Sequence, residues 1–396
     1  PTWTRPSRMM DNPLAWMILV DGMLLDARHL PRELQEEAVR VGAIPFLPDA
    51  EGPADGRAAA LWLGGGTVGD ADPDSPSGNG PDSLRGVIAE AEETIARMLE
   101  LNPDADDAEL NAALASAGDA YNRRPQTELG GLSPLAVQRL VEADWHSPGS
   151  SIRVVDTLSL AELAPSDLLH DARVVLELLA ERDAVKATPK GNLPRTFVAS
   201  FRERMRAGEA MDERWYATNP PRNEEDLRAL HHVRSLLELA GLVKRRVGKF
   251  SRTRRGERLT APEHAGRLFA LLLRTHFRAM NLAWLDRLAD APVFQYTIGY
   301  TFHQFARVGG EWRRAGELAG MLLLPSVREE IPPGPYGGDD AALMLETRFL
   351  RPLVRLGLAE ARENPREADE ILARASYRRT PLFDRVLAFD LDVATA

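Results

Sequence analysis

The chain has 396 residues, with 49 Lys and Arg against 59 Asp and Glu, and a net charge of −10. This length predicts two or three domains, and a hydrophobic content of 44% is enough for a core in each. Cysteine is absent, which excludes disulfides and thiolate metal sites. No apolar run reaches the roughly 18 residues of a membrane span, so we expect a cytoplasmic protein with no membrane partner.

Acidic residues dominate the first part of the chain. Residues 1–150 hold 11 basic and 25 acidic side chains, which argues against a nucleic-acid surface there. We expect residues 1–63 to form a small α/β segment. Its predicted elements are a strand pair at 16–20 and 23–25 and a helix at 31–41.

Residues 64–83 are rich in Gly, Pro, Asp and Ser and carry no large apolar side chain, so this segment is predicted to be a flexible linker. Apolar residues then recur with a period near 3.6 at 84–101, and a second helix is expected at 106–121. We therefore predict a helical hairpin or small bundle over residues 84–150.

The text YNRRPQTELGGLSPLAVQRL occupies residues 121–140. Gly130 and Gly131 predict a turn, Ser133 is suited to cap a helix, and Pro134 fits the first helical position. The wording is similar to a phrase near the end of some transposase integrase cores. The residues before it do not contain the spaced Asp and Glu catalytic set that an integrase carries on alternating strands and helices. The favoured interpretation is therefore a capped helix junction.

Positive charge is concentrated at residues 244–258, which hold eight basic side chains and one acidic one. The pattern predicts two short strands, 242–247 and 250–254, around a turn at Gly248 and Lys249, with a helix at 227–240 before them. A helix followed by a basic hairpin predicts a surface for a polyanion.

The second half of the chain reads as an internal duplication. The text SLLELAGLVKRR at 235–246 parallels FLRPLVRLGLAEAR at 349–362, and FSRTRRGERL at 250–259 parallels YRRTPLFDRVL at 377–387. The first copy is expected to contain helices at 168–181 and 193–206 around a strand at 184–188. The second is expected to contain helices at 294–308, 315–324 and 340–356 and strands at 358–363 and 376–382, with insertions rich in Gly, Pro and charge at 207–223 and 325–339.

This order of a leucine-rich helix, Gly-Leu, a charged strand, a turn and an aromatic-x-Arg-Thr strand resembles the winged-helix (helix-turn-helix) family. The resemblance implies a mainly α fold with small β-hairpins (α+β), in which residues 166–260 and 291–396 are tandem winged-helix modules. Residues 261–290 would connect them as one long helix at 264–290, which is either an interdomain strut or a homodimer contact.

A winged helix that binds DNA contacts phosphates through its wing and the segment before its second helix. We therefore expect a DNA-binding protein, with transcription regulation as its candidate role, whose contacts come from ten cations: Lys186, Lys190, Arg195, Lys244, Arg245, Arg246, Lys249, Arg252, Arg254 and Arg255. His231, Arg234 and Ser235 are further candidates one turn into the third helix.

The third helix of each copy begins with acidic residues, at 224–226 and at 339–340, and the second wing is acidic at 363–370. Carboxylates repel phosphate, so these helix starts are poorly suited to contact DNA. We therefore expect the wing to make most of the DNA contacts, with weak sequence specificity. The alternative is a non-catalytic adaptor whose winged helices bind protein, or a basic wing that pairs with the acidic residues 1–150 of the same chain.

Enzyme signatures are weak. The eight histidines form no HExxH or HxH set, so no metal is expected. His276 and His303 lie in apolar surroundings and are better explained as core residues. The Gly-rich run at 64–69 lacks the GK[ST] ending of a phosphate-binding loop. We predict no catalytic residues and no cofactor.

Overall fold

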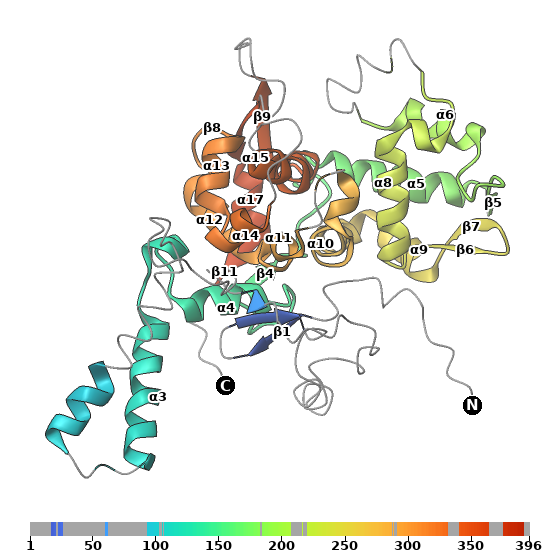
Figure 1. The fold of residues 1–396 in the computed structure, drawn as a ribbon. Coiled ribbons are helices and arrows are strands. Elements are labelled where there is room, and N and C mark those ends of the chain that lie inside the picture. Colours follow the sequence, from blue (N-terminus) through green and yellow to red (C-terminus); the bar gives the residue numbers. More distant parts are fainter. Residues whose placement is uncertain are drawn as a thin grey trace, which may run out of the picture. The chain divides into compact units, whose positions relative to one another are not determined.

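The structure is a computed structural model that describes residues 17–20, 23–26, 60–61, 93–102, 105, 107–182, 184–206, 216, 220–286, 288, 291–331, 340–363 and 375–391. The described part is mainly helical with small antiparallel sheets (Figure 1). The chain divides into two compact units. Unit 1 holds residues 1–142, 291–300 and 323–332, and unit 2 holds 143–290, 301–322 and 333–396. None of the helices in the described ranges is long and apolar enough to cross a bilayer.

Unit 1 contains the predicted strand pair, extended by a short third strand in the order β1-β2-β3. Ser133 accepts a hydrogen bond from the backbone N–H of Ala136, which confirms the capped junction. The elements of unit 1 are β1 (Met17–Val20), β2 (Met23–Asp26), β3 (Ala60–Leu61), a helix at 93–101, α3 (Asp107–Arg123), η3 (Thr127–Leu129), α4 (Pro134–Glu142), α11 (Pro292–Tyr296) and α14 (Pro325–Glu330). The helix expected at 31–41 and the linker at 64–83 lie outside the described residues.

The first part of unit 2, residues 166–260, is called module 1. Its elements run α5 (Asp167–Ala180), β5 (Val185–Lys186), α6 (Arg195–Arg204), η4 (Glu224–Asp226), α8 (Arg228–Leu239), β6 (Val243–Arg246), β7 (Lys249–Arg252) and α9 (Arg254–Thr260). The three strands form an antiparallel sheet in the order β5-β7-β6. The inner face of α5 is apolar and packs against α8, α6 and β7.

The unit 2 residues between 301 and 387 are called module 2, and they repeat this order of elements. They comprise the main part of α12 (Ile298–Val308), then β8 (Arg313–Arg314), α13 (Ala315–Leu322), α15 (Asp340–Leu345), the π-turn η8 (Glu346–Leu350), α16 (Arg351–Arg355), β9 (Ala359–Glu363), β10 (Ala375–Arg379) and α17 (Pro381–Val386). Their sheet has the order β8-β10-β9, which matches β5-β7-β6 strand for strand.

The same hydrogen bonds close the long helix in both modules. Gly241 and Gly357 end it with positive φ angles of 68° and 74°, a region that glycine adopts without a Cβ penalty. The Thr253 hydroxyl donates to the Gly241 carbonyl at 2.8 Å, and the Thr380 hydroxyl donates to the Gly357 carbonyl at 2.7 Å. The two copies of the Gly-Leu and Thr motif therefore make equivalent contacts.

Aromatic side chains fill the core of module 2. Phe302 packs edge-to-face against Phe277 and Phe349, with ring centroids 4.8 Å apart in each pair, and Phe305 and Phe383 extend the cluster. At the end of unit 2, β11 (Leu387–Phe389) pairs with β4 (Ile152–Val154), which ties the last strand to the segment before module 1.

Three sequence expectations are wrong in detail. The connection at 264–290 is not one long helix: η5 (Pro262–His264) and α10 (Ala265–Arg274) lead into a π-turn, η6 (Thr275–Ala279), and a short 3-10 turn, η7 (Leu282–Leu285), follows. The helix expected at 294–308 is divided at Thr297, whose hydroxyl donates to the Val293 carbonyl. The strand expected at 376–382 ends at Arg379, because Pro381 starts the helix α17.

Candidate nucleic-acid interface

The strand register of module 1 aligns three cations across the sheet. Lys186 on β5 lies opposite Lys249 on β7, and Lys249 lies opposite Arg246 on β6. Directly opposed residues of an antiparallel pair point to the same face, with Cβ atoms about 5 Å apart. We call Lys186, Lys249 and Arg246 the cation row (β5, β7 and β6 in Figure 1).

The cation row is exposed along its whole length, and Lys244 extends it on the same face of β6. None of these four side chains forms an ion pair with a carboxylate of the described residues. Like charges placed directly opposite one another destabilise a sheet. The row is therefore an unbalanced cationic surface.

The turn that ends this hairpin lies one residue earlier than predicted. Arg246 and Lys249 pair across it, so the two loop residues are Val247 and Gly248, with φ angles of 48° and 68°. Two-residue hairpin loops with positive φ at both positions fit the twist of the strands. Val247 is 91% exposed at the tip.

The other predicted wing cations have local roles or lie off the row. Arg245 shares the inner face with Phe250, lies 6.0 Å from its ring centroid and donates to the Gly191 carbonyl at 3.1 Å. Arg255 donates to the Ala240 carbonyl at 3.3 Å. Arg252 lies on the face of Val243, and Arg254 is exposed at the start of α9.

The loop between β5 and α6 is fixed by the acidic segment before α8. Lys190 lies 3.4 Å from the Glu225 carboxylate, which also accepts a 2.9 Å hydrogen bond from Asn192. Arg195 donates to the Asn223 side chain at 3.1 Å. Both predicted contacts of this loop are exposed, but Lys190 already faces a carboxylate.

Glu224 is the residue whose role the sequence did not reveal. It is fully buried and accepts hydrogen bonds from Arg234 at 2.6 Å and from the backbone N–H of Leu193 at 2.6 Å, while His231 lies 2.7 Å away. Burial raises the pKa of the Glu224 carboxyl, but these hydrogen bonds and the charge of Arg234 outweigh it and hold the pKa below its ordinary value.

This cluster corrects the role expected for the third helix. Arg234 is only 8% exposed and is shared between Glu224 and Glu238, so it is not available to read DNA bases. Asn223 and Asp226 form a reciprocal capping box. The acidic start thus consists of one buried ion pair, one cap and one partner for Lys190.

A chain of polar contacts joins the two modules through the interior of unit 2. Arg355 of α16 donates to the Asp171 carboxylate of α5 at 2.9 Å, and its other nitrogen lies 3.3 Å from His232. His232 in turn lies 3.1 Å from the fully buried His276. Among the described residues no group of three or more His, Asp or Glu side chains is placed to hold a metal ion.

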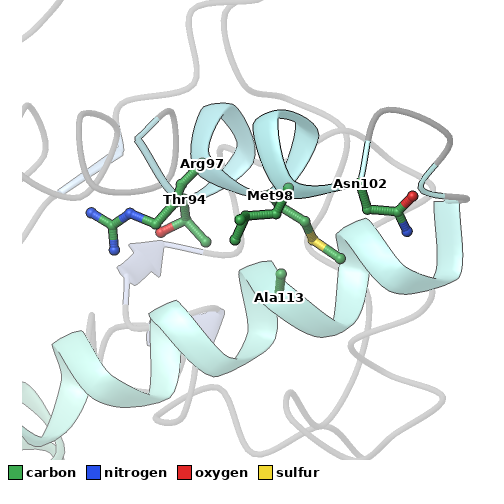
Figure 2. A pocket seen from close by; sticks show the side chains of 6 residues that line it. Thr94, Arg97, Met98, Asn102 and Ala113 are labelled. Carbon is green, nitrogen blue, oxygen red and sulfur yellow. The ribbon is translucent and has the colours of Figure 1, made fainter.

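An open hollow in unit 1 lies between the helix at 93–101 and α3 (Figure 2). It is lined by Ala113 of α3 and, from the helix at 93–101 and the residue after it, by Thr94, Arg97, Met98, Leu101 and Asn102. The lining offers no cluster of ionisable groups that would bind a charged ligand.

The comparisons with known proteins match one part of the chain. Residues 164–267 match the family model described as the Y4jL N-terminal domain, a span that coincides with module 1 and continues into α10. No curated protein and no solved structure matches the chain. The chain therefore contains a segment similar to the Y4jL N-terminal domain, and that likeness coincides with the module that carries the cation row.

Proposed function

We propose that this chain binds duplex DNA through the outer face of the β5-β7-β6 sheet. The observation that carries the proposal is the cation row, in which Lys186, Lys249 and Arg246 oppose one another across three strands without a described carboxylate partner. A phosphate backbone removes this repulsion, because each phosphate neutralises a cation and releases a condensed counterion.

We also propose that both modules are winged helices. The order of helix, strand, two helices and two strands supports this, as does the recurrence of the sheet order in module 2. In this fold the β6-β7 hairpin is the wing. The family match at 164–267 names a domain and no activity, so the proposal depends on topology and charge.

The proposed contact is directed to phosphates and has weak sequence specificity. Base readout requires free hydrogen-bonding side chains at the start of a recognition helix. In α8 that position is occupied by the buried pair of Glu224 and Arg234 and by the capping box of Asp226. A role in transcription regulation would require a second source of specificity, such as DNA shape.

The alternative proposal is an adaptor that binds acidic protein. It is favoured by the 25 acidic residues among residues 1–150 and by the position of β6 at the edge of its sheet. Exposed edge strands carry Lys and Arg as protection against aggregation, so cations there have a structural explanation of their own. Lys186 lies on β5, the other edge strand of this sheet, but Lys249 lies on the central strand β7, where edge protection does not explain a cation.

A mobility-shift titration separates the two proposals. The wild-type chain and the triple variant K186A/R246A/K249A are titrated with a 20-bp duplex at about 50 and 200 mM salt. We expect the wild type to bind, with affinity falling by orders of magnitude between the two salt concentrations, and the triple variant to bind far more weakly. Absence of wild-type binding at the lower salt concentration contradicts the proposal and favours the adaptor.

A further inference from the structure

The sheet of module 2 repeats part of the cation row. Arg314 on β8 lies opposite Ser376 on β10, and Ser376 lies opposite Arg362 on β9. Because Phe250 and Tyr377 occupy the same position in the two sheets, these three residues match Lys186, Lys249 and Arg246 in turn. Two of the three positions in the row are therefore cationic in both modules.

An aromatic residue on the same face lies against two of the module 2 cations. The guanidinium carbons of Arg362 and Arg378 lie 4.7 and 4.8 Å from the ring centroid of Trp312. A guanidinium group held against an indole keeps its N–H edge available for the bidentate geometry that phosphate accepts. Arg378 also pairs with Glu360 at 2.8 Å, whereas Arg362 is exposed and has no ion pair with a described carboxylate.

We infer that the face of module 2 formed by Trp312, Arg314, Arg362 and Arg378 is a second phosphate-binding surface, so that the chain contacts duplex DNA through both modules. This inference rests on the proposed function. Phosphate is favoured over an acidic peptide because the cations stand at the same sheet positions as the cation row. Glu360 already pairs with Arg378, so we expect this face to contribute fewer phosphate contacts than the cation row.

The test compares the dependence of affinity on salt for matched charge changes. The variant R314A/R362A removes two cations from the module 2 face, and R153A/R267A removes two exposed arginines that lie outside the β5-β7-β6 and β8-β10-β9 sheets. Fluorescence anisotropy with a 20-bp duplex gives the slope of log affinity against log salt. We expect R314A/R362A to make this slope shallower by up to about 1.8, at about 0.9 for each cation removed from a phosphate, and the control to leave it unchanged.

A conservative variant separates loss of charge from loss of packing. R314K/R362K keeps both charges while it removes the planar contact of Arg362 with Trp312, so we expect its slope to stay near that of the wild type. A wild-type slope for R314A/R362A overturns the inference. If R314A/R362A keeps the wild-type slope but K186A/R246A/K249A makes it shallower in the same assay, the inference is wrong and the proposed function stands. If none of the variants changes the slope, both are wrong.

Discussion

The sheets of module 1 and module 2 share a strand order but balance their outer charges differently. In module 1 the position opposite Ser251 is Lys244, and in module 2 the matching pair is Arg378 with Glu360, which form an ion pair. Inside module 1, the buried carboxylate of Glu224 holds α8 and the loop between β5 and α6 together. The same topology therefore leaves the outer cations of module 1 without a described carboxylate partner and pairs one outer arginine of module 2 with Glu360.

The largest expected effect is on the interior of module 1. Glu224→Ala leaves Arg234 buried without its main partner, so we expect the free energy of unfolding to fall by about 3–5 kcal/mol. Glu225→Ala is the matched control, because the side chain of Glu225 is half exposed and its removal costs less than about 1 kcal/mol. Urea denaturation measures both. Equal decreases for the two variants would show that Glu224 does not organise module 1.

The two helix-ending glycines give a matched pair between the modules. At Gly241 an added Cβ meets nothing within 4 Å, so Gly241→Ala costs only the strain of positive φ, about 1–2 kcal/mol. At Gly357 the same Cβ lies 2.9 Å from the carbonyl carbon and oxygen of Pro165, so the backbone must also shift. We expect Gly357→Ala to lower the melting temperature more than Gly241→Ala. The reverse order would contradict the packing of module 2 against the segment before α5.

Lowering the pH should weaken the buried polar contacts of Arg355, His232 and His276 that join the two modules. Burial, together with the charge of Arg355, lowers the pKa of His276 to about 3. The unfolded state then binds more protons than the folded state between about pH 6.5 and pH 3. The contribution of His276 is fully present above about pH 6.5 and decreases as the pH falls through this window.

The variant His276→Asn removes this contribution, together with the smaller effect that His276 has, after burial, on the lowered pKa of His232. We expect the free energy of unfolding to depend less steeply on pH in the variant, by about 1.4 kcal/mol per pH unit between pH 6 and pH 4. Burial raises the pKa of Asp171, which acts in the opposite direction in both proteins and cancels in the comparison. Parallel pH profiles for the wild type and the variant would show that His276 is accessible to protons.

Local patterns predict most of module 1 but not its cation row. The helices at 168–181 and 227–240 and the basic hairpin are predicted correctly, since helical periodicity and turn chemistry are local properties. The pairing of β5 with β7 joins residues about 60 positions apart, so no local pattern indicates that Lys186 belongs beside Lys249. The shift of the turn to Val247 and Gly248 also decides which cations face outward.

Charge counting fails for a different reason. A count treats Arg234, Arg245 and Arg246 alike, yet the first is bonded to two carboxylates, the second lies over an aromatic ring and only the third is in the cation row. The alternation of strand residues would have separated Arg245 from Arg246, because neighbouring residues point to opposite faces. The partner of Arg234 could not be found this way, since Glu224 lies in a segment that reads as an ordinary helix start.

The central claim is that the cation row binds phosphate, and the salt dependence of duplex binding tests it most directly. Fluorescence anisotropy gives the slope of log affinity against log salt for the wild type, for K186A/R246A/K249A and for a control, R153A/R267A/R328A, that removes the same charge from exposed positions outside the β5-β7-β6 and β8-β10-β9 sheets. We predict a slope shallower by up to about 2.7 in the row variant, at about 0.9 for each phosphate contact, and a wild-type slope in the control. Equal slopes in all three folded proteins would contradict the claim.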